Sequence, residues 1–256
     1  MSRSTKPDSQ GITAYLEEVL NHAQFGDYPG AHNGLQIENS GKVVRICAAV
    51  DACEPVLNEA AKVPGTLLLV HHGMLWSGGQ PFTGPLRRKL KVALENDLAL
   101  FSSHLPLDAH PTMGNNAQLA RLLGVQRLKP AFVAKGQPIG CIGKLKITRT
   151  ALVQKLEKAL DGSVHVAPGG PDRVQTIGIC SGGSGTEVAQ AQALGCDTFL
   201  CGEGPHHTYT LAEEIGVNLI YGGHYATETL GVRALAAHAS TKFGLPWTFI
   251  AHPTGL

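Results

Sequence analysis

Short apolar segments alternate with segments of helical periodicity along most of the chain. Apolar residues at helical spacing predict a first helix over 13–23, and a loop rich in Gly, Pro and Asn follows it. The pattern then predicts strands and helices in alternation, over 43–50, 55–62, 66–70, 85–96 and 98–101. Such alternation favours βαβ units in a mainly parallel sheet, with functional loops beyond the carboxyl ends of the strands.

The second half of the chain repeats this pattern. The segment from Arg45 to Gly73 resembles the segment from Thr176 to Gly204 in its order of strand, turn, helix and apolar strand. An H-x-x-x-D motif begins at His104, and an H-x-x-x-E motif begins at His224 in the corresponding place of the second half. We therefore predict an internal duplication.

The predicted fold class is α/β, with two similar lobes and mainly parallel sheets. The first lobe comprises residues 1–128 plus 222–256, and the second comprises residues 129–221. The second lobe includes a less regular middle part, in which a helix is predicted over 149–160. We expect the two motifs to meet in a cleft between the lobes.

The composition is that of a folded protein with little net charge. The 21 basic and 20 acidic residues give a net charge of +1, and 43% of residues are hydrophobic. These values disfavour a disordered chain and a general nucleic-acid-binding protein. The polar N-terminus and the short apolar runs predict no targeting or membrane segment, so we expect a cytoplasmic protein. The six cysteines include no C-x-x-C pair, and we expect them to be buried apolar residues.

A histidine pair stands at the end of a buried strand. The apolar run over 67–70 stops abruptly at His71 and His72. Adjacent residues of a strand point to opposite faces, so both rings can face one site only if the strand ends before them. Gly73 would allow such a break. The alternative interpretation is that one of these histidines is a packed, hydrogen-bonded core residue.

Two further stretches carry histidine with carboxylate. His104 and Asp108 follow a short apolar strand, and Pro106 is expected to keep this stretch as a loop. His224 and Glu228 follow a glycine pair, and on a helix their spacing of four places them on one face.

Imidazole nitrogen and carboxylate oxygen together suit zinc, iron or manganese. These stretches offer more ligands than one four-coordinate ion needs, and a carboxylate can bridge two ions about 3.5–4 Å apart. We therefore predict two divalent transition-metal ions per chain.

Four sequence motifs closely resemble one family. They are NGLQI at 33–37, HHGMLW at 71–76, SHLPLDAHPTMGNNAQLA at 103–120 and GGHYATETLGVRAL at 222–235. The family is that of the Nif-three-like dinuclear metal-centre proteins, often catalogued as GTP cyclohydrolase I type 2 homologues. The resemblance covers nearly the whole chain and implies metal ligands at His71, His72, Asp108, His224 and Glu228. It also implies that the two lobes are interlinked, that His104 lines the site and that the chain forms a toroidal homohexamer with its metal sites facing an internal cavity.

Other candidates carry less information. The SGGSGTE segment at 181–187 lacks the lysine and the glycine spacing of phosphate-binding loops, so we interpret it as a tight turn between strand and helix. His206 and His207 form a second pair with Glu203 nearby. We interpret Glu203 and His206 as candidate contacts to substrate or to the wall of the cleft.

These residues favour a metal-dependent hydrolase that uses a metal-activated water. His104 would act as general acid or base, and the family's name suggests a GTP cyclohydrolase-like reaction on a nucleotide or phosphate-containing substrate. The first alternative is a non-catalytic metal-binding protein with a regulatory or trafficking role. A remote alternative is a toroidal DNA-binding protein, which the net charge of +1 disfavours.

Overall fold

The computed structural model describes residues 8–76 and 78–256, which form two compact α/β units. Unit 1 consists of residues 1–107 with 232–252, and unit 2 of residues 108–231 with 253–256. The chain therefore passes from unit 1 to unit 2, back to unit 1, and into unit 2 again at residue 253. The first two divisions fall within helices, α4 (Leu105–Asp108) and α9 (His224–Phe243).

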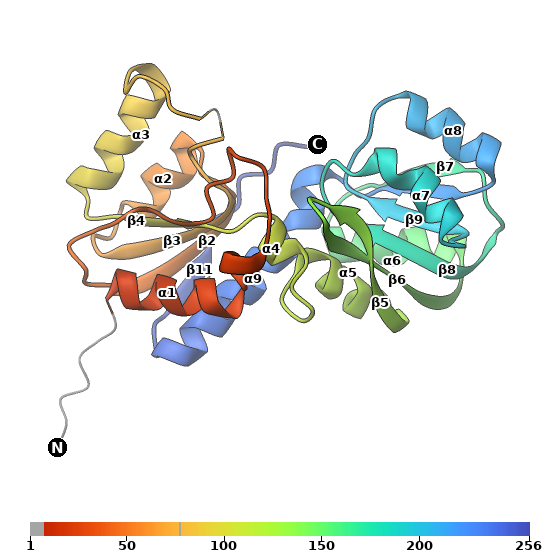
Figure 1. Cartoon of the computed structure of the whole chain (residues 1–256), viewed down its shortest axis with the longest axis horizontal. Coiled ribbons are helices and arrows are strands. Elements are labelled where there is room, and N and C mark those ends of the chain that lie inside the picture. The colour runs from red at the N-terminus through yellow and green to blue at the C-terminus, as the bar shows by residue number, and fades with distance from the viewer. Residues whose placement is uncertain (1–7, 77) are drawn as a thin grey trace. The chain divides into compact units, whose positions relative to one another are not determined.

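Unit 1 is built on a five-stranded sheet in the order β1-β4-β3-β2-β11. Its strands are β1 (Gly34–Ile37), β2 (Arg45–Asp51), β3 (Thr66–His72), β4 (Ala99–Ser102) and β11 (Trp247–Phe249). Among these strands only β1 pairs antiparallel to its neighbour, so the sheet is mainly parallel. As Figure 1 shows, α2 and α3 lie on one face of this sheet, and α1 with the C-terminal part of α9 lies on the other.

The α-helices of unit 1 bury apolar residues in its core, while its short 3-10 helix buries none. These helices are α1 (Ser9–Val19), the 3-10 helix η1 (His22–Gln24), α2 (Glu54–Ala60) and α3 (Gly84–Glu95). One core cluster joins Val56 and Leu57 of α2 to Leu68 and Val70 of β3, all of which are at most 1% exposed. Such a core positions the end of β3, where the histidine pair lies.

Unit 2 is built on a six-stranded sheet in the order β5-β6-β8-β9-β10-β7. Its strands are β5 (Gln126–Ala134), β6 (Gln137–Thr148), β7 (His165–Pro168), β8 (Arg173–Cys180), β9 (Thr198–Cys201) and β10 (Asn218–Tyr221). Its other helices are α5 (Asn115–Leu123), α6 (Arg149–Leu160), η2 (Gly185–Glu187), α7 (Val188–Ala193) and α8 (His207–Ile215). One apolar core packs α5 and α6 on the sheet, and a second core packs α7 and α8.

The two units share the order of elements that the predicted repeat requires. In unit 1, β2, β3 and β4 are parallel neighbours with α2 and α3 between them in sequence. In unit 2, β8, β9 and β10 are parallel neighbours with α7 and α8 between them. An antiparallel strand then pairs with the last member of each set, β1 with β4 and β7 with β10. The α/β fold class with two sheets is confirmed.

The sheet of unit 2 differs from the expected mainly parallel arrangement. Of its strands only β8, β9 and β10 are parallel, while β5, β6 and β7 all pair antiparallel. This region is irregular in sequence because Pro130, Pro138 and Gly140 interrupt its apolar runs. In the structure these residues lie in the long β5–β6 hairpin, whose ends are joined through Lys135 and Gly136 in left-handed conformations.

Two helices differ from their predicted bounds. The first begins at Ser9 rather than at residue 13, because Asp8 caps it by accepting a hydrogen bond from the Gly11 amide. The stretch after His104 forms the short helix α4 instead of a loop. Pro106 is compatible with this helix because proline is tolerated in a first helical turn. By contrast, α6 has the predicted bounds of 149–160.

The compact units also have different bounds from the predicted lobes, which ended at residues 128 and 221. Residues 108–128 belong to unit 2. The reason is packing, since Leu119 and Leu123 of α5 lie in the same apolar core as Leu152 and Leu156 of α6.

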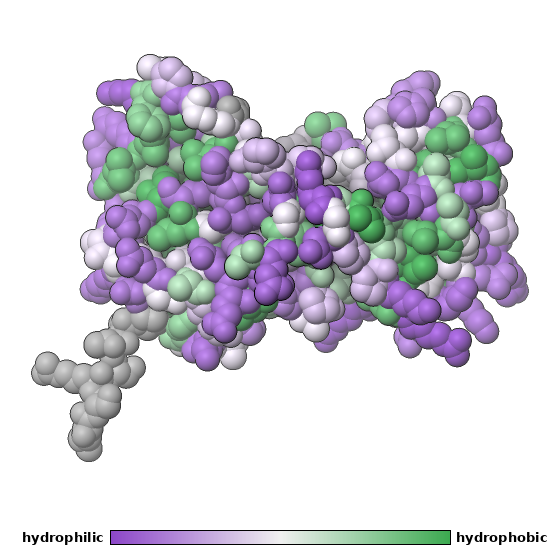
Figure 2. Space-filling model, in the orientation of Figure 1, coloured by the Kyte–Doolittle hydropathy of each residue, from purple (hydrophilic) through white to green (hydrophobic). Residues whose placement is uncertain are grey.

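Most cysteines are buried, as expected from the sequence, and some apolar side chains are exposed. Five of the six cysteines are buried, while Cys53 is partly exposed. Among exposed apolar side chains, Phe82 and Leu94 are 71% and 68% exposed. Figure 2 shows apolar residues on the surface over α3. No helix in the described part of the chain is long and apolar enough to cross a membrane.

Candidate metal centre

The histidine pair lies inside the end of β3. The strand includes both His71 and His72, so the expectation that it ends before them is wrong. Their rings nevertheless lie together, with centroids 4.8 Å apart. The neighbouring strand explains this arrangement, because β4 pairs with β3 only as far as Val70 and Ser102. Beyond that point, the His71 ring turns toward the chain that leaves β4 and contacts the carbonyl oxygen of Ser103.

His104 joins this pair from the loop after β4. Its ring centroid lies 5.0 Å from that of His71 and 5.7 Å from that of His72. One ring nitrogen from each of the three histidines lies within 4.8 Å of the others. His71 is fully buried, and the His104 side chain is only 13% exposed. Unit 1 therefore contains a compact three-histidine group with the geometry to hold a metal ion.

Each histidine of this group directs its Nδ1 to an oxygen acceptor. Nδ1 of His71 lies 3.0 Å from the Ser103 carbonyl oxygen, and Nδ1 of His72 lies 2.8 Å from Oδ1 of Asp51. Nδ1 of His104 lies 2.9 Å from Oδ1 of Asp27. Carbonyl and carboxylate oxygens only accept, so the imidazoles donate from Nδ1. The lone pair is then on Nε2, the arrangement usual for a histidine that binds a metal ion.

Asp27 organises the loop that carries His104. Besides the imidazole, its carboxylate accepts hydrogen bonds from the Leu105 amide and from Nδ2 of Asn33. Burial raises the pKa of Asp27, but the hydrogen bonds from His104, Asn33 and the Tyr28 amide outweigh it and hold this pKa below its usual value. Asp27 is therefore a stable anion that fixes the imidazole of His104.

The NGLQI motif acts on the same loops. Oδ1 of Asn33 accepts from the His104 amide at 2.7 Å, and Oε1 of Gln36 accepts from the Met74 amide at 2.8 Å. Gly73 lies so close to the Gln36 amide group that a Cβ atom there would overlap it. The motif therefore holds the segments after β3 and β4, which explains the close approach at Gly73.

Unit 2 contains the other predicted histidine with two carboxylates. Nε2 of His224 lies 3.2 Å from Oε2 of Glu228, one turn along α9, which confirms that the H-x-x-x-E motif shares one helix face. Nδ1 of His224 lies 2.8 Å from Oε1 of Glu203, in the loop after β9. The Glu228 side chain is only 4% exposed. Hydrogen bonding to Glu228, with a further contribution from Glu203, raises the pKa of His224 to about 9 against the effect of burial.

Asp108 is also held in unit 2. Its side chain is buried, and Oδ1 accepts hydrogen bonds from Nδ2 of Asn115 at 2.8 Å and from Oγ of Ser181 at 3.1 Å. Asn115 in turn accepts from the Gly231 amide of α9. Asp108 is thus a positioned carboxylate, as a metal ligand requires.

The SGGSGTE segment supports these carboxylates instead of forming only a turn. Ser181 bonds Asp108, and Gly182 has a φ of +64° and lies against the Glu228 carboxylate. A Cβ atom at Gly182 would overlap Oε1 of Glu228. The carbonyl oxygen of Gly182 accepts from the amides of Gly202 and Glu203. This turn therefore connects three parts of unit 2 that carry candidate ligands or their partners.

Some residues of these groups were not predicted from the sequence. They are Asp27, Asp51, Asn115 and Ser181, each of which bonds a predicted residue. Glu203 was predicted as a wall or substrate contact, and the structure places this carboxylate on His224. His207 lies exposed at the start of α8, and His206 lines a pocket together with Glu203.

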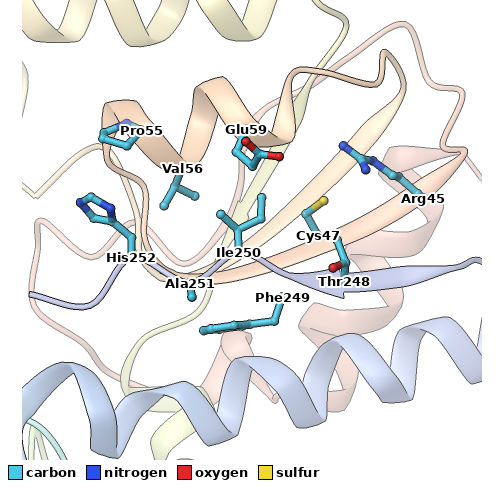
Figure 3. Close-up of a pocket in the computed structure, with 10 residues that line it drawn as sticks. All are labelled: Arg45, Cys47, Pro55, Val56, Glu59, Thr248, Phe249, Ile250, Ala251 and His252. Atoms are coloured by element: carbon cyan, nitrogen blue, oxygen red, sulfur yellow. The ribbon is translucent and has the colours of Figure 1, made fainter.

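A separate pocket of about 380 Å³ lies on unit 1, where β2 and β11 meet α2. Figure 3 shows Arg45 and Cys47 on β2, Glu59 on α2, and Thr248 and Phe249 on β11 around it. Within the described chain, its lining includes none of the predicted site residues. The candidate metal ligands therefore lie outside this pocket.

The donor sets of both units suit a divalent transition metal. Imidazoles with their Nδ1 atoms engaged, and buried carboxylates held by amide and hydroxyl donors, match the ligand types of zinc, iron and manganese sites. His71, His72, His104 and His224 each have Nδ1 engaged in this way.

The chain is similar to proteins of one family over nearly its whole length. The Duf34/NIF3 (NGG1p interacting factor 3) family profile matches residues 8–254. A Deinococcus radiodurans protein named GTP cyclohydrolase 1 type 2 homolog is 40% identical over 96% of this chain and 93% of its own length. A protein of the same name from Pyrococcus abyssi is 36% identical over 97% of this chain and 100% of its own.

The solved structures agree with this similarity. The crystal structure of TTHA1606 from Thermus thermophilus matches with a TM-score of 0.88 at 38% identity, covering 97% of this chain and 100% of that one. The matches in sequence and in structure thus extend over both units. The chain belongs to the Duf34/NIF3 family.

Proposed function

We propose that the chain is a metal-dependent hydrolase with a dinuclear centre held by His71, His72, Asp108, His224 and Glu228. The observation that carries the proposal is that His71, His72, His104 and His224 each direct Nδ1 to an oxygen acceptor, which leaves Nε2 as the nitrogen for a metal ion. Such outer contacts orient metal-binding imidazoles and raise their basicity. Nε2 of His224 lies beside Oε2 of Glu228, which is itself a proposed ligand. The curated relatives share the name GTP cyclohydrolase 1 type 2 homolog, which supports a hydrolytic reaction on a nucleotide or phosphate-containing substrate.

The residues divide into two roles under this proposal. The three imidazoles and two carboxylates would bind two ions of zinc, iron or manganese. Bound ions would supply Lewis acidity, which activates water and polarises the substrate. The Ser103 carbonyl, Asp51 and Glu203 would fix these imidazoles through Nδ1.

His104 is the proposed general acid or base. Its ring lies with His71 and His72, and the edge of Trp76 packs on it with ring centroids 4.8 Å apart. Asp27 holds its Nδ1, so Nε2 is the atom that would exchange a proton with substrate or water.

The experiment is a turnover screen of the metal-loaded protein against nucleoside triphosphates, phosphoesters and amides. We expect at least one class to be hydrolysed, and we expect His104→Ala to lower kcat by about 10²- to 10⁴-fold while retaining metal. Turnover that survives Glu228→Gln unchanged at equal metal content would contradict the proposed centre. Metal binding without turnover of any class would contradict the hydrolase and favour a metal-binding regulatory or trafficking protein.

We also propose that the chain forms a homohexamer, as the resemblance of its motifs implies. The exposed side chains of Phe82, before α3, and Leu94, in α3, support association, because exposed apolar surface commonly marks protein interfaces. The net charge of +1 gives no support for a nucleic-acid partner. Native mass spectrometry tests the assembly, and a monomer at micromolar concentration would contradict it.

A further inference from the structure

A pocket of about 460 Å³ opens in unit 2 beside the proposed metal ligand His224. Tyr221, the last residue of β10, and His165, the first residue of β7, lie on its wall. Tyr209 from α8 and Glu203 from the loop after β9 also line it. Its volume is within the usual range of small-molecule sites, about 300–1,000 Å³. We call it the aromatic pocket.

Three aromatic rings line this pocket, and the His165 ring packs on both tyrosines. The ring of His165 is inclined by 27° to that of Tyr221, with centroids 5.9 Å apart. It is inclined by 32° to the ring of Tyr209, with centroids 5.5 Å apart. Aromatic rings interact favourably in such offset arrangements, and a planar ring of a ligand would extend the same stack.

Hydrogen bonds and packing hold the tyrosines in place. The hydroxyl of Tyr221 lies 2.7 Å from Oγ1 of Thr208. Both tyrosines also pack against the apolar core formed by α7, α8 and the sheet. The aromatic walls are therefore preformed, which lowers the entropic cost of binding a rigid planar ligand.

Glu203 gives the pocket a specific polar feature. Its Oε1 accepts from Nδ1 of His224, while the side chain as a whole is 45% exposed. An ionised carboxylate has two oxygens with about four acceptor positions, so Glu203 can accept from a ligand as well as from His224. A ligand with N–H donors at its edge could donate a hydrogen bond to Glu203. Such a ligand would be separated from the proposed metal ligand His224 only by the Glu203 carboxylate.

The pocket is poorly suited to a phosphate group. Within the described part of the chain, no lysine or arginine lines it, and its charged group is the carboxylate of Glu203. Phosphate recognition relies on arginine, lysine or clustered backbone amides. The ring portion of a ligand, not a phosphate, fits this chemistry.

We propose that the aromatic pocket binds a planar nitrogen heterocycle that carries an amino group, stacked on His165, Tyr209 and Tyr221 and hydrogen-bonded to Glu203. This inference rests on the proposed function, because it names the part of the substrate that the pocket would hold beside the metal centre. A ring hydrogen-bonded to Glu203 would share this carboxylate with the proposed ligand His224.

Three small probes separate the contributions of stacking and hydrogen bonding. 2-Aminobenzimidazole has both the plane and the N–H donors, benzofuran has the plane alone, and cyclohexylamine has the amine alone. Binding is measured by ligand-observed NMR and calorimetry on the full chain, both as purified and after EDTA treatment. We expect 2-aminobenzimidazole to bind most tightly, and to bind with or without metal.

Variants locate the binding. Tyr209→Leu and His165→Ala should each weaken 2-aminobenzimidazole binding by roughly 3- to 10-fold, as expected for loss of one aromatic contact. Glu203→Gln should weaken 2-aminobenzimidazole and leave benzofuran unchanged. His207→Ala is the matched control, because His207 is exposed on the same helix and does not line the pocket. His165 is exposed, so its variant keeps the test valid if Tyr209→Leu does not fold.

The experiment can overturn the proposed ligand binding in the aromatic pocket and the proposed metal centre independently of each other. Equal binding of 2-aminobenzimidazole to wild type, Tyr209→Leu and His165→Ala would overturn the pocket, as would cyclohexylamine binding as tightly. Metal content is measured on the same samples. A protein that binds the probe in the pocket but never binds metal would overturn the proposed function and leave the pocket intact.

Discussion

The Nδ1 atom of His72 lies 2.8 Å from Oδ1 of Asp51, which is its cross-strand partner at the ends of β3 and β2. The carboxylate is partly exposed and the imidazole is mostly buried, with exposures of 33% and 19%. The pairing of β2 with β3 therefore places the Asp51 carboxylate against Nδ1 of His72, a proposed metal ligand. The pair belongs to unit 1 alone and is independent of how the chain continues into unit 2.

This relationship predicts that Asp51 controls metal affinity without being a ligand. Asp51→Asn should weaken zinc binding by about 10- to 100-fold, because the amide orients the imidazole less strongly and lowers its basicity. Competition against a chromophoric chelator measures the change. Asp161→Asn is the control, since Asp161 is exposed and its left-handed conformation also suits asparagine. Equal zinc affinity in the two variants would show that the Asp51 contact has no role in binding.

Gly182 should be required both for its conformation and for its contact with Glu228. Gly182→Ala places a Cβ against Oε1 of Glu228 at a φ of +64°. Gly216→Ala imposes the same kind of strain at a φ of +76°, where a Cβ would meet nothing within 4 Å. We expect the Gly216 variant to lose about 1 kcal/mol of unfolding free energy.

The Gly182 variant should lose about 1–3 kcal/mol more, because its Cβ also overpacks the site. It should also retain less metal, since Glu228 must move. Urea denaturation and metal analysis of both variants test this pair. Similar losses at the two positions would mean that the turn does not support Glu228.

His22 should make the folded protein sensitive to acid. Burial lowers the pKa of His22 to about 4, although the nearby Asp27 opposes the shift. The unfolded chain binds this proton below a pH of about 6.5, while the folded chain stays neutral at this position down to about pH 4. Protonation therefore favours the unfolded state, and stability is lost as the pH falls from 6.5 toward 4.

His22→Gln removes this titration and can keep a hydrogen bond to Oγ of Ser103, which lies 2.9 Å from Nε2 of His22. In EDTA-treated protein, the slope of unfolding free energy against pH should be shallower between 6.5 and 4 for the variant than for wild type. Parallel slopes would exclude His22 as a source of the acid sensitivity.

The cysteines should differ sharply in reactivity. Burial raises the pKa of the Cys141 and Cys180 thiols to about 12, and it also raises the pKa of Cys201. The thiolate is the reactive form, so these side chains should resist iodoacetamide at about pH 8. Cys53 is partly exposed at the start of α2 and should be alkylated first. Mass spectrometry of native and urea-unfolded protein measures the order, and early labelling of Cys180 or Cys201 would contradict it.

The candidate ligands could be predicted because their motifs are local. His71 and His72 stand at the end of an apolar run, and His224 and Glu228 are one helical turn apart, so sequence spacing indicates their placement. The oxygen partners could not be predicted in the same way. Asp27 lies 77 positions from His104 along the chain, and its role follows only from the loop that carries both into contact.

The limits of the fold prediction have a similar cause. The parallel strands of both units were visible as short apolar runs with helices between them. The β5–β6 hairpin was not, because its pairing depends on register between residues such as Ala131 and Gly140 rather than on a hydrophobic pattern. Likewise, α5 packs with α6 through residues that are far apart in the sequence, such as Leu119 and Leu152, so local patterns do not reveal the contact.

Metal content per chain tests the central claim most directly. Protein purified without chelator and without a His tag is analysed by elemental mass spectrometry, beside the His71→Ala, Glu228→Ala double variant. A His207→Ala, Glu214→Ala double variant serves as the control, because both residues are exposed on α8. We predict about two transition-metal ions per chain in wild type and in the control, as a dinuclear centre requires, and their loss in the ligand variant. No bound metal, even after reconstitution with zinc, iron or manganese, would contradict the ligand assignment and the hydrolase with it.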